Sequence, residues 1–171
     1  MLHLLVSLIA LLQLGCGPSS KTLMREVIDK YKQERALLEQ LAAMAVTDRD
    51  LYRIDRYGVK MYSESGPSVP PDRVEKYQST LAQLGAESLD VHREGDAVTL
   101  VAICYRIRGI SVSHSNWGWF YVPDHRSPLG HYSNSRIVSS IESASMEGAK
   151  TGNETLLQKL GDNWYAFYET D

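Results

Sequence analysis

The chain is poor in cysteine, with only two among 171 residues, which is too few for a disulfide scaffold. It also lacks an excess of either charge, because 18 basic residues face 21 acidic ones. General affinity for nucleic acid, which needs a concentrated basic surface, is therefore not expected. A hydrophobic fraction of 43% and a charged fraction of 23% argue against a disordered chain, a collagen and a multi-span membrane protein. The remaining class is globular, and one domain is expected at this length.

The sequence also lacks the common catalytic signatures. It contains no GxSxG, CxxC, HExxH, P-loop or GxGxxG motif. Each of these motifs places a nucleophile, a metal or a phosphate in a defined backbone setting, so their absence excludes only the enzyme classes that depend on them. We expect no catalytic residue, no metal site and no cofactor, and a binding or scaffolding role is favoured over an enzyme.

Long apolar runs are absent except at the N-terminus, where residues 4–14 are mostly aliphatic and residues 1–15 contain no Asp, Glu, Lys or Arg. An eleven-residue run is shorter than the about 20 residues that a membrane-spanning helix needs. It matches the roughly 7–15 residues of the apolar segment of a secretory signal. Residues 1–15 are therefore predicted to be a cleaved signal peptide, and the alternative is a buried N-terminal helix.

Residues 12–16, LQLGC, follow this apolar run and resemble the lipobox of bacterial lipoproteins. The resemblance implies that the chain is cut after Gly15 and that Cys16 becomes the lipidated N-terminal residue. Several acyl chains anchor a protein stably where one does not. Gly17 stands where an Asp usually retains a lipoprotein in the inner membrane, so the resemblance implies an outer-membrane protein of the bacterial envelope that faces the periplasm.

After this motif, residues 16–20 are expected to form a short tether and residues 21–171 a single domain. Residues 21–46 contain no Gly or Pro, and their apolar residues recur at spacings of three, four or seven. This pattern predicts an amphipathic helix with Ser20 or Thr22 as its cap. Arg35 interrupts the apolar seam, which favours packing on a sheet over a coiled-coil arm.

A second helix is predicted over residues 71–84, because Pro71 suits its first turn and Gly85 suits its C′ position. Residues 48–64 fit a helix and a strand equally well. Residues 137–146 are expected to hold a short helix. Beyond Gly85 the apolar period changes from about four to two, which predicts strands, at residues 88–93, 97–108, 110–122, 155–160 and 164–169.

This order predicts an α+β domain, with N-terminal helices packed on one face of an antiparallel β-meander of about five strands. The outline resembles small lipoproteins of unknown function. It is also similar to cone-shaped folds of the nuclear transport factor 2 type, which implies a small-ligand-binding domain as an alternative.

Cys104 is the only thiol that remains if Cys16 is lipidated. A small Cys/His hydrolase using Cys104 with His92 or His114 is the catalytic alternative, although free Cys is usually a buried apolar residue. Four side chains of types that ligate metals lie close together in the sequence: His114, Asp124, His125 and His131. Their spacing is irregular for a zinc site, so exposed loop positions are favoured for them.

The most distinctive run is residues 117–121, WGWFY. Strand alternation places Trp117, Trp119 and Tyr121 on one face. Packing beneath the first helix is one role for them, and a binding platform for a glycan, a peptide or an envelope protein is the other. Gly118 indicates a bulge or a close approach of another backbone. The expected partners are therefore the membrane, through the lipid anchor, and a ligand of this kind.

Overall fold

The computed structural model describes residues 19–62, 69–110, 113–123, 127–132, 134–141, 144 and 154–170. The predicted signal peptide and Cys16 lie outside the described residues, as do Asp124 and His125. Within the described residues the α-helices are α2 (Ser20–Thr47) and α3 (Pro71–Leu84). The strands are β1 (Leu51–Asp55), β2 (Gly58–Met61), β3 (Ser88–Glu94), β4 (Ala97–Ile110), β5 (Ser113–Tyr121), β6 (Ser135–Val138), β7 (Glu154–Lys159) and β8 (Trp164–Thr170).

Helix α2 confirms the predicted long amphipathic helix, with its cap one residue earlier than expected. The Oγ atom of Ser19 accepts a hydrogen bond from the Thr22 N–H at 3.2 Å, which satisfies a backbone donor that the first helical turn leaves free. Glu34 departs from helical geometry, with φ −112° and ψ 19°. The regular helix is therefore interrupted directly before Arg35.

Helix α3 begins at Pro71 and ends at Gly85, as the sequence predicts. Gly85 has a φ of +65°, a left-handed conformation that suits glycine because it has no Cβ atom. The two helices are joined through Asp48, at the end of α2. Its Oδ2 atom accepts hydrogen bonds from Arg73 Nε at 3.0 Å and from Tyr77 Oη at 2.7 Å.

The strands form one sheet in the order β2-β1-β3-β4-β5-β8-β7-β6. The α+β class is confirmed, but the described residues form eight strands of this sheet, which corrects the expected number of about five. Residues 51–61 form the β1–β2 hairpin, and residues 135–138 form β6 where a helix was expected. The sheet is mixed because β6 pairs with β7 in parallel. Strands of four or five residues are too short to show a clear alternation, so sheet pairing rather than local pattern defines them.

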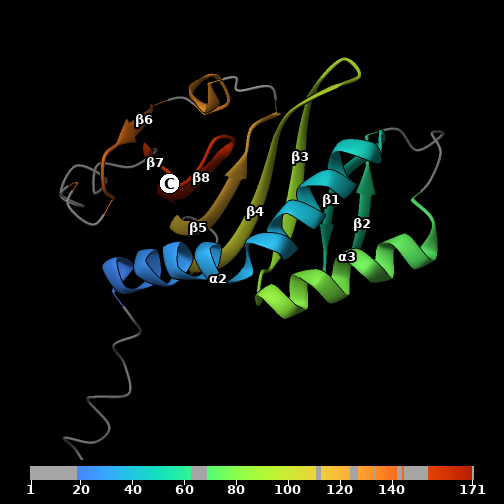
Figure 1. Ribbon diagram of the computed structural model, residues 1–171, viewed down its shortest axis with the longest axis horizontal. Helices are drawn as coiled ribbons and strands as arrows, with labels where there is room; N and C mark the ends of the chain where they lie inside the picture. The colour runs from blue at the N-terminus through green and yellow to red at the C-terminus, as the bar shows by residue number, and fades with distance from the viewer. Residues whose placement is uncertain are drawn as a thin grey trace, which may run out of the picture.

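Both helices cover the same face of this sheet (Figure 1), where α2 contacts β4, β5 and β8, and α3 contacts β1. We call this the helix face, and it carries most of the buried core. The opposite side, the outer face, carries a second and smaller apolar cluster, against which Tyr132 packs. Its buried members are Leu100, Ala102, Phe120, Val122, Leu157, Tyr165 and Phe167.

Gly118 confirms the predicted close approach of two backbones in the centre of the sheet. A Cβ atom at this position would lie 2.0 Å from the carbonyl oxygen of Ile103. The register between β4 and β5 shifts between Cys104 and Arg106, directly beside Gly118. At this irregularity β4 therefore lies nearer to β5 than a Cβ atom at position 118 would permit.

Candidate ligand-binding site

The structure places the two tryptophans of the WGWFY run in the core of the helix face. Trp119 is fully buried, and its Nε1 atom donates a hydrogen bond to the Val27 carbonyl of α2 at 3.0 Å. Trp117 is 2% exposed and stacks on Tyr168 with ring centroids 5.2 Å apart. Neither indole offers an open surface to a ligand. Only Tyr121, at the end of β5, remains half-buried.

The structure places Cys104 and His92 on the outer face without bringing them together. Cys104 is opposite Ser88 in the β3–β4 pair, whereas His92 is opposite Leu100. Four residues along a strand span about 13 Å, so no thiol–imidazole pair exists between them. Burial raises the pKa of the Cys104 thiol to about 12, which leaves it uncharged and unreactive near neutral pH. His114 lies in β5, and its side chain is outside the described residues.

Charged residues of β1 and β3 also meet on the outer face. Arg53 Nη1 lies 2.9 Å from Asp90 Oδ1, and Arg53 Nε lies 3.3 Å from Asp55 Oδ2. Burial raises the pKa of Asp90, which the Arg53 guanidinium partly opposes. Ser88 Oγ lies 3.3 Å from the second Asp90 oxygen. These charges satisfy one another, and the group is a structural ion cluster rather than an open site.

The histidines of the outer face do not form a metal site in the described part of the chain. His92 and His131 face each other with ring centroids 5.9 Å apart. Across the residues that the structure describes, no three His, Cys, Asp or Glu side chains gather closely enough to hold a metal ion.

The helix face contains a hollow beside Tyr121, which we call the α2–turn hollow. It has a volume of about 250 Å³ and lies between α2, the end of β5 and the β7–β8 turn. The α2 residues of the lining lie on one face of the helix, because they follow Arg35 at spacings of four, seven and eight residues. The lining combines two small alanines, which leave the space, with charged, amide and aromatic side chains around them. Its residues are Arg35, Glu39, Ala42, Ala43, Tyr121, Asp162, Asn163 and Trp164.

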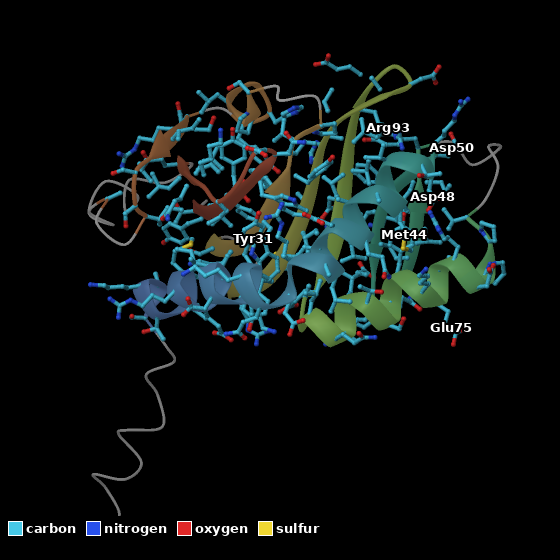
Figure 2. All side chains as sticks on the ribbon, in the orientation of Figure 1. Tyr31, Met44, Asp48, Asp50, Glu75 and Arg93 are labelled. Atoms are coloured by element: carbon cyan, nitrogen blue, oxygen red, sulfur yellow. The ribbon has the colours of Figure 1, made fainter. Side chains whose placement is uncertain are left out.

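Asn163, which lines this hollow, has a buried Oδ1 atom without a hydrogen-bond partner among the described residues. The Oη atom of Tyr31 is also buried without such a partner; Tyr31 does not line the hollow but interacts with its charged residues. Tyr31 is 5% exposed, and its hydroxyl lies against the β7–β8 turn, because a Cβ atom at Gly161 would be 2.6 Å from it. Figure 2 shows Tyr31 on α2. A buried polar atom without a partner costs about 1–3 kcal/mol, so the Asn163 oxygen gains stability from a ligand that bonds it.

The charges of the hollow act on Tyr31 as well. Burial raises the pKa of its hydroxyl, the Arg35 charge lowers this pKa, and Glu39 and Asp162 raise it. Arg35 Nε lies 2.7 Å from Glu39 Oε1. The guanidinium and both carboxylates are therefore close enough to Tyr31 to form one polar environment around the hollow.

Each of two other hollows is lined in part by an arginine that already bonds to the protein itself. In one, of about 360 Å³, Arg106 donates to the Gly85 carbonyl at 3.1 Å and lies 4.4 Å from the Tyr105 ring centroid. In the other, of about 510 Å³, Arg93 donates to the carbonyls of Ala45 and Asp48 at the end of α2. Both arginines close helix ends, a role that needs no ligand.

The sequence pattern identified Tyr121 but not the polar side chains of the hollow. Only Arg35 could have been found from the sequence, since a charged residue on the apolar face of a helix indicates that this part of the face is not fully covered. Asp162 and Asn163 gave no signal, because Asp and Asn are ordinary turn residues.

Comparison of the chain with protein-family models, with curated proteins and with solved structures finds no match. In the described part of the chain, no helix is both long enough and apolar enough to cross a membrane.

Proposed function

We propose that this protein is a lipid-anchored binding domain of the bacterial cell envelope. Cys16 attaches it to the outer membrane, and the domain binds its ligand in the α2–turn hollow without catalysis. The observation that carries the binding role is the unpartnered buried Oδ1 atom of Asn163, a residue that lines the hollow between α2 and the β7–β8 turn.

The dimensions of the chain are consistent with a site close to the membrane. Ser19 and Ser20 belong to the cap and first turn of α2, so only residues 17 and 18 remain as a tether, which reaches roughly 7 Å when extended. Arg35 follows Ser20 by fifteen residues, about 22 Å along a helix. A ligand of the hollow would therefore belong to the space directly beside the membrane.

The described residues favour binding over the hydrolase alternative. A catalytic thiol needs a base that stabilises its thiolate, and the outer face separates Cys104 from His92 by the Asp90–Ala102 pair. The buried thiol donates a hydrogen bond to the Arg106 carbonyl at 3.7 Å instead. Cys104 acts here as a core residue.

The two cysteines provide a matched pair of variants for testing the anchor. Cells that express the full chain are labelled with a palmitate analogue and then separated into membrane and soluble fractions. We expect Cys16→Ser to lose both the label and membrane retention, whereas Cys104→Ala keeps both. Membrane retention of the Cys16→Ser protein, or loss of label in Cys104→Ala alone, would contradict the proposed anchor.

A further inference from the structure

We infer that the ligand of the α2–turn hollow is a single sugar residue without an acidic group, presented by a glycan. This inference rests on the proposed binding function and adds the chemical class of the ligand.

The size of the hollow limits the ligand to one ring. Sites for drug-sized molecules usually measure about 300–1,000 Å³, and this one measures about 250 Å³. A peptide normally lies in an extended groove or along a sheet edge, whereas this hollow is bounded by α2 on one side and by a turn on another. A compact group that enters from one end fits this shape better than a chain that passes through.

The unpartnered Asn163 Oδ1 atom calls for a ligand that has a hydrogen-bond donor. This amide oxygen can only accept a hydrogen bond. A sugar hydroxyl can donate one to it. A hydrocarbon ligand could not and would leave the buried oxygen unsatisfied.

The charges of the lining favour a neutral ligand over an acidic one. One cation, Arg35, faces two anions, Glu39 and Asp162. Arg35 is already paired with Glu39 at 2.7 Å, so a carboxylate or phosphate would meet the unbalanced charge of Asp162. A neutral sugar avoids this repulsion and can still bond the carboxylate through its hydroxyls.

Aromatic residues complete the lining. The Tyr121 and Trp164 rings both line the hollow and lie 5.1 Å apart. Tyr121 is the half-buried member of this group. An aromatic surface next to hydrogen-bonding groups suits a sugar ring, which is apolar on its C–H faces and polar around its edge.

Ligand-observed NMR on the full lipidated chain tests this inference, in a detergent that has no sugar headgroup. The probes are the methyl glycosides of glucose, galactose, mannose and N-acetylglucosamine, each at up to about 10 mM. Methyl glucuronide, which differs from methyl glucoside by its carboxylate, is the acidic counterpart. We expect at least one neutral glycoside to bind, and the glucuronide to bind at least about tenfold more weakly than the glucoside.

Three variants locate the binding. Asn163→Ala should weaken it by about tenfold or more, since it removes an acceptor that only the ligand satisfies. Asp162→Asn should reduce the difference in affinity between methyl glucoside and methyl glucuronide, because it removes a negative charge from the lining. Glu75→Ala, which changes an exposed residue of α3 (Figure 2), should bind as the parent does.

The opposite results have distinct meanings. Absence of binding by every neutral glycoside, or binding that Asn163→Ala leaves unchanged, overturns the sugar assignment. If tri-alanine then binds and Asn163→Ala abolishes its binding, the ligand is a peptide and the proposed binding function stands. If neither the glycosides nor tri-alanine bind in the hollow, the proposed binding function is wrong as well as the sugar assignment. This outcome does not depend on whether Cys16 is lipidated.

Discussion

At the scale of single residues, Gly118 is a position where the sheet has no room for a side chain. Its missing Cβ atom would lie 2.0 Å from Ile103 O and 2.9 Å from Phe167 Cε1. The first of these contacts is to backbone, which cannot move aside without shifting β4. The neighbouring aromatic residues of β5 depend on this approach for their place beneath α2.

Gly118→Ala should therefore lower the free energy of unfolding by about 1–3 kcal/mol or more, as overpacking of a core does. Urea denaturation measures this loss. Gly58→Ala is the matched control, because a Cβ atom there meets nothing within 4 Å, and its effect should stay within about 0.5 kcal/mol. Equal losses in the two variants would show that the β4–β5 approach is not as close as described.

His92 gives the stability of the fold a dependence on pH. Burial lowers the pKa of its imidazole, the neighbouring His131 lowers it further, and Asp90 opposes both. The unfolded chain, with an ordinary histidine pKa of about 6.5, binds a proton that the folded protein excludes. Stability from this residue is therefore complete above pH of about 6.5 and declines as the pH falls below it.

His92→Gln should remove part of this decline, up to about 1.4 kcal/mol per pH unit for one proton. Urea denaturation between about pH 5 and pH 7 compares the slopes of the variant and the parent. A parent that loses no more stability than His92→Gln over this interval would contradict the lowered pKa.

At the scale of the elements, Asp48 joins the two helices (Figure 2). Its carboxylate accepts hydrogen bonds from Arg73 and Tyr77 of α3, and Tyr77 is fully buried. The hydroxyl of Tyr77 can be satisfied here only while the carboxylate of α2 remains in place. The contact thus sets the position of α3 against the end of α2.

Asp48→Ala should destabilise the protein by about 1–3 kcal/mol, because it leaves a buried hydroxyl and a guanidinium without their acceptor. Asp50→Ala, two residues further along, should have a much smaller effect. Thermal unfolding followed by circular dichroism compares them. A similar loss in both variants would mean that the general acidity of this segment matters, and not the specific contact.

The helices and the central strands could be predicted from sequence because each carries a long pattern. Residues 21–46 show a long helical period that only Arg35 interrupts, and Pro71 and Gly85 mark the ends of α3. The β1–β2 hairpin and β6 could not be predicted, because they are short and depend on pairing with distant strands. The close approach at Gly118 was predictable because a glycine inside a strand often marks a bulge or a neighbouring backbone.

The candidate site was predicted only in part. Trp117 and Trp119 share a strand face with Tyr121, but α2 covers the two tryptophans and leaves Tyr121 at the edge. The pattern of a strand shows which side chains share a face, whereas coverage of that face depends on the helix above it. Asp162 and Asn163 come from a turn more than forty residues beyond Tyr121, and only the pairing of β5 with β8 brings them there.

At the scale of the whole molecule, the sheet separates two environments. The outer face holds an apolar cluster and a satisfied ion cluster beside it. The helix face holds the core and, at its edge, the α2–turn hollow with the unpartnered Asn163 Oδ1 atom. The proposed binding site therefore lies on the helix face, beside the helix that follows the proposed anchor.

The proposed place of the protein in the cell depends on the anchor at Cys16, and the intact mass of the protein purified from membranes is the decisive measurement. Removal of the first fifteen of 171 residues leaves 156. We therefore expect the mass of a chain that begins at Cys16, increased by several acyl groups. Cys16→Ser should give no acylated species. A membrane-derived protein with the mass of the unmodified 171-residue chain would contradict the anchor.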